Sequence, residues 1–126
     1  MNDQAGVQFH RWADIPEEPM KGTITRRMIS GEKAMIAQIV LKKGDTVPRH
    51  SHHNEQLTYV ITGRLRLRLG ERGEREVVVA AGEVLVIPPN LAHSAEALED
   101  TLDIDVFAPP REDWLNRTDD YLSKDA

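Results

Sequence analysis

The chain has 126 residues, of which 40% are hydrophobic and 29% are charged, and its formal net charge is −5. This length suits one domain, and the composition is that of an ordinary globular protein. A net negative charge repels polyanions, so nucleic acid is not expected as a partner. Because the sequence contains no cysteine, disulfides, thiolate metal sites and cysteine nucleophiles are excluded.

The N-terminal sequence MNDQAGVQFHRW has neither the basic segment nor the apolar core of a signal peptide, and no apolar run approaches the length of a membrane span. We therefore expect a cytoplasmic protein that has no membrane partner. Residues 1–30 are expected to form an irregular N-terminal arm, because Pro16 and Pro19 interrupt any helix. Trp12 and Ile15 are the apolar residues that would anchor this arm.

Short β-strands are predicted in succession from residue 34 onward. Turns rich in glycine, proline and asparagine separate strand patterns over residues 34–42, 57–62, 64–69, 75–80, 83–87, 92–98 and 101–107. In residues 64–69 arginine and leucine alternate strictly, which predicts a half-buried strand with its leucines on one face. Short strands at even spacing favour an all-β sandwich or a closed jelly-roll barrel.

We divide the chain into the arm of residues 1–30, a barrel of residues 31–108 and a C-terminal tail of residues 109–126. After two consecutive prolines, residues 111–115 and 119–122 have the pattern of short helical turns. Trp114 and Leu115 are expected to pack the tail onto the barrel. Exposed edge strands and the arm suggest pairing with a second copy of the chain, so a homodimer is expected.

Three of the five histidines follow one another closely, at positions 50, 52 and 53. Side chains two positions apart on a strand point the same way, so His50 and His52 can converge on one ion while His53 faces the other side. Gln56 shares the parity of His50 and His52, and its carboxamide oxygen is a possible metal ligand. His93 belongs to a later predicted strand and would complete the site if that strand lies beside the first.

Imidazole and oxygen ligands without thiolate suit one divalent transition metal ion, and these ligands do not choose among Zn, Ni, Fe, Mn and Co. The alternative for an isolated H-x-H pattern is a polar turn that holds no metal. The wider spacing of the motif residues decides between the two interpretations.

The glycines, prolines and histidines fall at the spacings of two motifs, through which the sequence resembles the cupin family. The first motif, G-x5-H-x-H-x3-E-x6-G, is matched by Gly44, His50, His52 and Gly63, with Gln56 where the family usually has Glu. The second motif, G-x5-P-x-G-x2-H, is matched by Gly82, Pro88 and His93, with Asn90 in the last glycine position. The resemblance implies a cupin jelly-roll β-barrel, antiparallel and all-β, with a short helical C-terminal tail and one metal ion held by His50, His52, Gln56 and His93.

Both departures from the motifs have physical interpretations. Asparagine is the next-best residue after glycine at a left-handed turn position, so the fold tolerates Asn90. Gln56 replaces a carboxylate by a neutral amide, which leaves the site one unit more positive and favours an anionic ligand. Some cupins that isomerise substrates carry glutamine here, whereas three histidines with one glutamate are typical of cupin dioxygenases. The resemblance thus favours isomerase or lyase chemistry over oxygen chemistry.

A second resemblance extends over nearly the whole chain. The segments HSHHNEQLTYVITGRL, IPPNLAHSAEALED and DVFAPPREDWL are similar to the small cupins of the KdgF type, which take part in pectin degradation. In that family a D-x-F-x3-R segment lines the pocket, which by position points to Asp105, Phe107 and Arg111. On the predicted strand of residues 101–107, Asp103, Asp105 and Phe107 share one face.

The KdgF-like cupins convert 4,5-unsaturated uronate monosaccharides into open-chain 4-deoxy-5-keto forms. The resemblance therefore implies a small, anionic, sugar-derived substrate, with the metal as Lewis acid and Arg111 as a catalytic and substrate-binding anion clamp. Asp105 would carry a proton as the second catalytic residue, and Phe107 would shape the substrate pocket. The structural alternatives are that Asp105 caps a loop, that Arg111 pairs with Glu112 or Asp113, and that Phe107 belongs to the core.

Two further functions stay open at this stage. An Fe-dependent cupin dioxygenase would need redox-active iron and two open coordination positions. A non-catalytic, ligand-binding cupin would use the metal only to hold the barrel together, because a fold does not establish a function.

Overall fold

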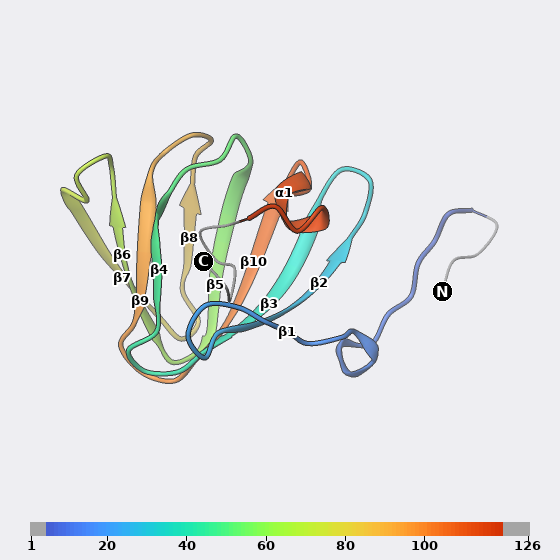
Figure 1. Ribbon diagram of the computed structural model, residues 1–126, viewed down its shortest axis with the longest axis horizontal. Coiled ribbons are helices and arrows are strands. Elements are labelled where there is room, and N and C mark those ends of the chain that lie inside the picture. The colour runs from blue at the N-terminus through green and yellow to red at the C-terminus, as the bar shows by residue number, and fades with distance from the viewer. Residues whose placement is uncertain (1–4, 120–126) are drawn as a thin grey trace.

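The computed structural model describes residues 5–119, and these fold into two antiparallel β-sheets that enclose a common core (Figure 1). One sheet has six strands in the order β1-β2-β3-β10-β5-β8, and the other has four in the order β4-β9-β6-β7. The strands are β1 (Glu18–Pro19), β2 (Thr25–Ser30), β3 (Met35–Leu41), β4 (Thr46–His50), β5 (Glu55–Thr62), β6 (Arg64–Leu69), β7 (Arg75–Ala80), β8 (Val84–Ile87), β9 (His93–Ala97) and β10 (Thr101–Ala108). The predicted all-β jelly-roll architecture is confirmed.

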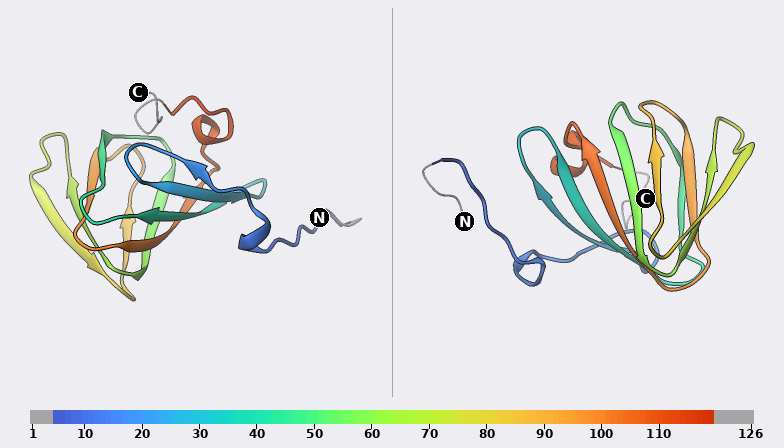
Figure 2. Two further views of the ribbon diagram at one scale, coloured as in Figure 1. Left: turned by 60° about the horizontal axis from the view of Figure 1, so that its bottom comes forward. Right: turned by 180° about the vertical axis from the view of Figure 1, so that it is seen from behind.

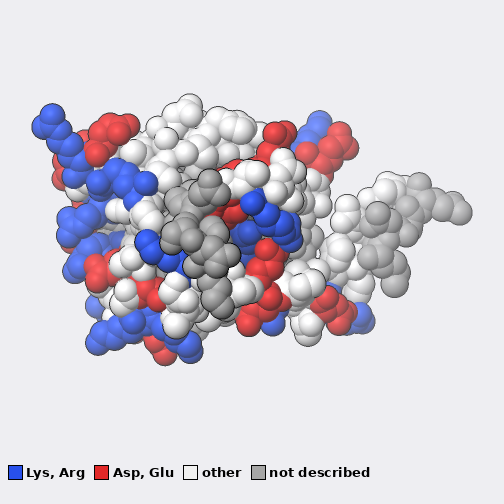
Figure 3. Space-filling model, in the orientation of Figure 1, with Lys and Arg blue, Asp and Glu red and all other residues white. Residues whose placement is uncertain are grey.

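Alternation of side chains decides which face of each strand is buried. In β6 the three leucines are buried, and the arginines between them point outward. There they join acidic neighbours: Arg66 binds Glu96 at 3.0 Å, and Arg68 binds Glu76 at 3.0 Å. On the face drawn in Figure 3, basic and acidic side chains are interspersed in the same way.

Strand β10 lies in the middle of the larger sheet, between β3 and β5. Its buried positions alternate strictly and include two aspartates, Asp103 and Asp105, followed by Phe107. The apolar core around them combines residues of both sheets, among them Met35 and Ile39 of β3 and Leu67 of β6. Two carboxyl groups therefore lie inside the barrel beside its apolar core, which is unusual unless they serve a site.

Three strands were not predicted from the sequence: β2, β4 and the two-residue β1, which lies in the segment expected to be irregular. Residues 25–30, expected to be irregular, form β2, which pairs with β3 from Thr25 opposite Val40 to Ser30 opposite Met35. Residues 46–50 form β4, which pairs with β9. The irregular part of the arm is therefore shorter than expected, and Figure 2 shows it extending away from the barrel. Among its described residues, from 5 onward, it contains one helical turn, η1 (Trp12–Asp14).

The C-terminal tail contains one short helix, α1 (Glu112–Leu115). Trp114 is buried as expected, but Leu115 is 42% exposed, so the prediction that both residues pack on the barrel is wrong for Leu115. The predicted turn over residues 119–122 lies outside the described residues except for Asp119. Within residues 5–119, no helix is both long and apolar enough to cross a membrane.

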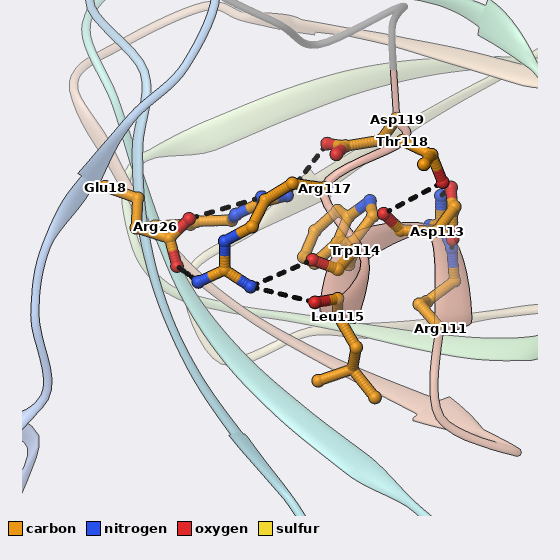
Figure 4. A network of polar contacts seen from close by, with 9 residues as sticks. All are labelled: Glu18, Arg26, Arg111, Asp113, Trp114, Leu115, Arg117, Thr118 and Asp119. Carbon is orange, nitrogen blue, oxygen red and sulfur yellow. Dashed lines mark hydrogen bonds and ion pairs between the residues drawn. The ribbon is translucent and has the colours of Figure 1, made fainter.

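Ion pairs fasten the tail to the first strands (Figure 4). The Arg26 guanidinium on β2 donates to the Asp119 carboxylate at 2.9 Å, and both residues are buried. Arg117 donates to Glu18 at 2.8 Å nearer the surface. The Arg26 guanidinium also stacks on the Trp114 ring, 4.6 Å from its centroid. These contacts hold Trp114 against one end of the barrel.

Candidate metal centre

Three predicted ligands, His50, His52 and His93, meet in the structure. One ring nitrogen from each lies within 4.8 Å of the others. His50 ends β4, His93 begins β9 directly opposite it, and His52 follows in the loop after β4. The ring centroids of His50 and His93 are 4.3 Å apart, and those of His52 and His93 are 5.1 Å apart. His53 is exposed and lies outside this group, as its opposite parity predicted.

Backbone carbonyls orient the three imidazoles in the same way. The Nδ1 atoms of His50, His52 and His93 lie 2.8, 3.1 and 2.8 Å from the carbonyl oxygens of Pro48, Asn54 and Leu91. Because a carbonyl oxygen only accepts, each Nδ1 carries the proton and each Nε2 keeps its lone pair. The Nε2 atom of His93 is buried and has no hydrogen-bond partner among the described residues. A metal ion would supply the missing partner, so this donor set fits one.

The environment keeps these histidines neutral. Burial, together with the neighbouring His93, lowers the pKa of His50 to about 3. Burial and the positive charge of Arg111 lower the pKa of His52 to about 4, and burial also lowers the pKa of His93. Imidazoles must be unprotonated to bind a metal, so the site is ready for a cation at neutral pH.

Gln56 on β5 is the fourth predicted ligand, and it is buried beside His52. Its Oε1 atom lies 3.0 Å from the Nε2 atom of His52, and its Nε2 atom donates to the Thr58 hydroxyl at 2.8 Å. Since the His52 proton is on Nδ1, a lone pair of nitrogen faces a lone pair of oxygen. A cation between or beside the two atoms would relieve this repulsion. Gln56 thus lies where the sequence motif predicted a ligand.

The turn that carries His93 depends on Asn90. This residue has a positive φ of 67°, the left-handed conformation expected for the last glycine position of the second motif. Its backbone N–H donates to the His52 carbonyl at 2.8 Å. Asn90 therefore adopts the turn that the motif requires and ties the two histidine-bearing segments together.

Two members of the histidine group, His50 and His93, line a cavity inside the barrel. Side chains from both sheets and from the tail line it. Its apolar wall includes Ile24, Leu41, Leu67 and Trp114. Its polar lining consists of His50, Gln56, Thr58, His93, Asp103, Asp105 and Arg111.

Asp105 and Phe107 point into this cavity from β10. The Thr58 hydroxyl donates to the Asp105 carboxylate at 2.9 Å, so Asp105 does not cap a loop. The neighbouring Asp103 is also buried, and one of its oxygens has no hydrogen-bond partner among the described residues. Burial raises the pKa of both carboxyls, and the pKa of Asp103 rises further because Asp105 lies beside it. We therefore place a proton on Asp103, which donates to Asp105.

Arg111 combines two of the arrangements considered from the sequence. It lines the cavity, and it also forms a forked pair with Asp113, with its Nε and Nη2 atoms 2.9 and 2.7 Å from the carboxylate oxygens. Its guanidinium lies 5.0 Å from the Phe107 ring centroid and 4.9 Å from that of Trp114. Asp113 and the two rings fix the guanidinium plane, and the positive charge lies at the cavity wall. Phe107 is likewise both a core residue and part of the cavity.

Thr58, Met20 and Ile24 are among the cavity residues that sequence reasoning missed. Thr58 shares the parity of Gln56 on β5, a signal that could have identified it. Met20 and Ile24 precede β2 and reach the cavity from the region expected to be an irregular arm. No pattern in the sequence indicates that these two residues fold back over the barrel.

Comparisons with known proteins agree with this geometry. Residues 37–107, more than half of the chain, match the family model described as the cupin domain. An RmlC-like cupin from Shewanella frigidimarina is 27% identical with a TM-score of 0.78, over 86% of this chain and 96% of that one. KdgF from Halomonas sp. is 26% identical with a TM-score of 0.77, over 85% of this chain and 99% of that one.

Larger cupins are similar to this chain in fold alone. The oxalate decarboxylase of Bacillus subtilis, a protein with Mn(II) centres, is 24% identical with a TM-score of 0.68. That match covers 78% of this chain but only 28% of the decarboxylase. The family match over residues 37–107 and the histidine group at the motif positions show that the chain belongs to the cupin family, with an RmlC-like cupin and a KdgF among the similar structures.

Proposed function

We propose that this protein is a metal-dependent cupin enzyme that opens the ring of 4,5-unsaturated uronate monosaccharides. One observation carries the proposal: Asp105, Phe107 and Arg111 line the same cavity as His50 and His93. The likeness to KdgF from Halomonas sp. over nearly the full length of both chains supports it. This likeness favours a small anionic substrate, for which Arg111 provides a positive charge.

The reaction is an isomerisation, so the atoms of substrate and product are the same. Loss of the proton from the anomeric hydroxyl lets the bond between C1 and the ring oxygen break, which gives an aldehyde at C1 and an enolate at C5. A proton delivered to C4 converts the enolate into the 5-ketone. The enzyme therefore needs one group that accepts a proton and returns it, in a cavity with little water.

Asp105 is suited to this proton transfer. It is buried in the cavity, and its carboxylate is held by the Thr58 hydroxyl on one side and by protonated Asp103 on the other. Burial raises its pKa, which makes it a stronger base than an exposed carboxylate. Phe107 forms the adjacent wall, and Arg111 attracts the substrate carboxylate.

His50, His52, Gln56 and His93 would hold the metal ion. When bound, a divalent metal would act as a Lewis acid that polarises a substrate oxygen. The residues of the chain itself would orient the sugar and move the proton.

Loss of the ultraviolet absorbance of the conjugated C4–C5 double bond tests the proposal. The metal-loaded protein is expected to accelerate this loss on unsaturated uronates derived from galacturonate or guluronate. If it accelerates neither, the proposed activity is refuted. Consumption of dioxygen that depends on added Fe(II) would indicate the dioxygenase alternative instead, and absence of both reactions would favour a ligand-binding cupin.

We also infer that the protein pairs with a second copy of itself. Strand β8 lies at the edge of the larger sheet, and Val84 and Val86 on it are 55% and 54% exposed. On β5, Tyr59 and Leu57 lie directly opposite these valines, so an apolar surface extends across the two strands. The inference predicts a dimer by light scattering in solution, and it predicts that Val86→Lys gives a monomer. A monomeric wild-type protein would refute it.

A further inference from the structure

Three consecutive polar contacts, two of them hydrogen bonds, connect the histidine group to the buried carboxyls. His52 Nε2 lies 3.0 Å from Gln56 Oε1, Gln56 Nε2 donates to Thr58 Oγ1 at 2.8 Å, and Thr58 Oγ1 donates to Asp105 Oδ1 at 2.9 Å. Thr58 stands in the middle of this chain of contacts. So far it has appeared only as a hydrogen-bond donor to Asp105.

The position of Thr58 follows from the register of the sheet. Thr58 lies directly opposite Asp105 in the β5–β10 pair, and Gln56 precedes it by two positions on the same face of β5. Thr58 is 1% exposed, and Gln56 and Asp105 are 7% and 8% exposed. Bulk water therefore cannot easily replace a lost partner in this row, so each of the three groups depends on its neighbours.

The hydroxyl of Thr58 fixes the direction of the hydrogen bonds. It has one proton, and the Asp105 carboxylate can only accept, so the Thr58 proton goes to Asp105. The Thr58 oxygen can then only accept from Gln56, which places the Gln56 amide nitrogen on the Thr58 side. The Gln56 carbonyl oxygen must therefore face the histidines, which is the orientation that a metal ligand needs.

We propose that Thr58 is a positioning residue that couples the metal ligand Gln56 to Asp105: one hydroxyl holds the amide oxygen toward the metal site and the carboxylate in the cavity. The role of Asp105 in turnover rests on the proposed function. The coupling to Gln56 concerns metal binding and does not depend on the substrate.

This arrangement also gives a reason for glutamine at position 56. A glutamate there would have no N–H to donate to Thr58, and the single Thr58 proton could not satisfy two carboxylates. Two buried carboxylates would then compete for one donor. The departure from the usual cupin motif is thus matched to the threonine two positions later.

Titration of Co(II) into the metal-free full-length protein, followed by calorimetry and by the visible spectrum of the bound ion, tests the coupling. Thr58→Val removes the hydroxyl and keeps the side-chain shape. Thr58→Ala removes it without placing a methyl group against Asp105, and Thr58→Ser is the matched control that keeps it. We expect the first two variants to bind Co(II) about tenfold more weakly with a changed spectrum, and Thr58→Ser to stay within about twofold of the wild type.

A second comparison shows whether Thr58 acts through Gln56. In a Gln56→Ala background, Thr58→Val should weaken Co(II) binding no further, because the residue that Thr58 positions is gone. Equal Co(II) affinity of the Val, Ala and Ser variants would overturn the proposal, as would additive effects in the Gln56→Ala background or a wild-type protein that binds no Co(II). If the wild type does not turn over unsaturated uronates but these Co(II) affinities follow the expected order, the proposed function fails and the coupling stands.

Discussion

His50 and His93 lie directly opposite each other in the β4–β9 pair, and their ring centroids are 4.3 Å apart. Both rings are held through Nδ1 by the carbonyl of the residue two positions earlier, so both Nε2 lone pairs are available on the same side of the ladder. Antiparallel pairing of β4 and β9 therefore builds half of the metal site. His52 and Gln56 supply the other half from the loop after β4 and from β5.

Replacing Asp105 separates metal binding from catalysis. Asp105→Asn keeps the size of the side chain but removes the proton-accepting carboxylate, so turnover of unsaturated uronates should fall by about 100-fold or more. Metal content should stay near that of the wild type, because the amide oxygen of Asn can still accept the Thr58 proton and no proposed ligand is changed. The exposed Asp14→Asn serves as control. Full activity of Asp105→Asn would show that this carboxylate does not carry the proton.

The stability of the metal-free protein should fall in acid, because the histidines bind protons more weakly in the folded protein than in the unfolded chain. The pKa of His50 is about 3 in the folded protein, against its ordinary value of 6.5. Its contribution to stability is complete above pH 6.5 and is lost as the pH falls from there toward 3. The raised pKa values of Asp103 and Asp105 act in the opposite direction, since their contribution is lost as the pH rises.

A variant isolates the histidine contribution. As the pH falls from 6.5 to 4, the free energy of unfolding should decrease less steeply in His50→Gln than in the wild type. The two slopes should differ by up to about 1.4 kcal/mol per pH unit. Urea unfolding in the presence of a chelator measures this difference, with the exposed His53→Gln as a control for loss of an imidazole. Parallel curves for His50→Gln and the wild type would contradict the assignment.

The buried ion pair between Arg26 and Asp119 should stabilise the barrel through the tail. Among the described residues, Asp119→Ala leaves the buried Arg26 guanidinium with the more distant carboxylate of Glu18, at 3.4 Å, so the free energy of unfolding should fall by about 3 kcal/mol. Arg117→Ala removes an exposed pair of similar length and should cost less than about 1 kcal/mol. Urea unfolding measures both, and equal losses would refute the distinction between the two pairs.

The sequence predicted the elements whose side chains alternate regularly. The alternation of arginine and leucine in residues 64–69 identified β6, and the motif spacing identified His50, His52, Gln56 and His93 as a group. Strand β2 was missed because a charged residue, Arg26, occupies its buried face. That arginine is compensated by Asp119, far away in the chain, and a local pattern cannot reveal such a partner.

The alternatives for Arg111 show a second limit of prediction from the sequence. The sequence left open whether Arg111 pairs with a nearby acid or lines the pocket, and the structure shows that it does both. Only the packing of Phe107 and Trp114 around the guanidinium makes the two arrangements compatible. Thr58 was missed for the same reason: its importance comes from its partner on β10 and not from its own neighbours in sequence.

Metal content tests the central claim most directly. Plasma mass spectrometry on gently purified protein should find about one equivalent of a divalent transition metal per chain, the content of a single-site cupin. A folded variant that carries both His52→Ala and His93→Ala should have lost it, because only His50 and Gln56 would remain. Retention of the metal by that variant, or no metal in the wild type even after reconstitution, would contradict the account of this site.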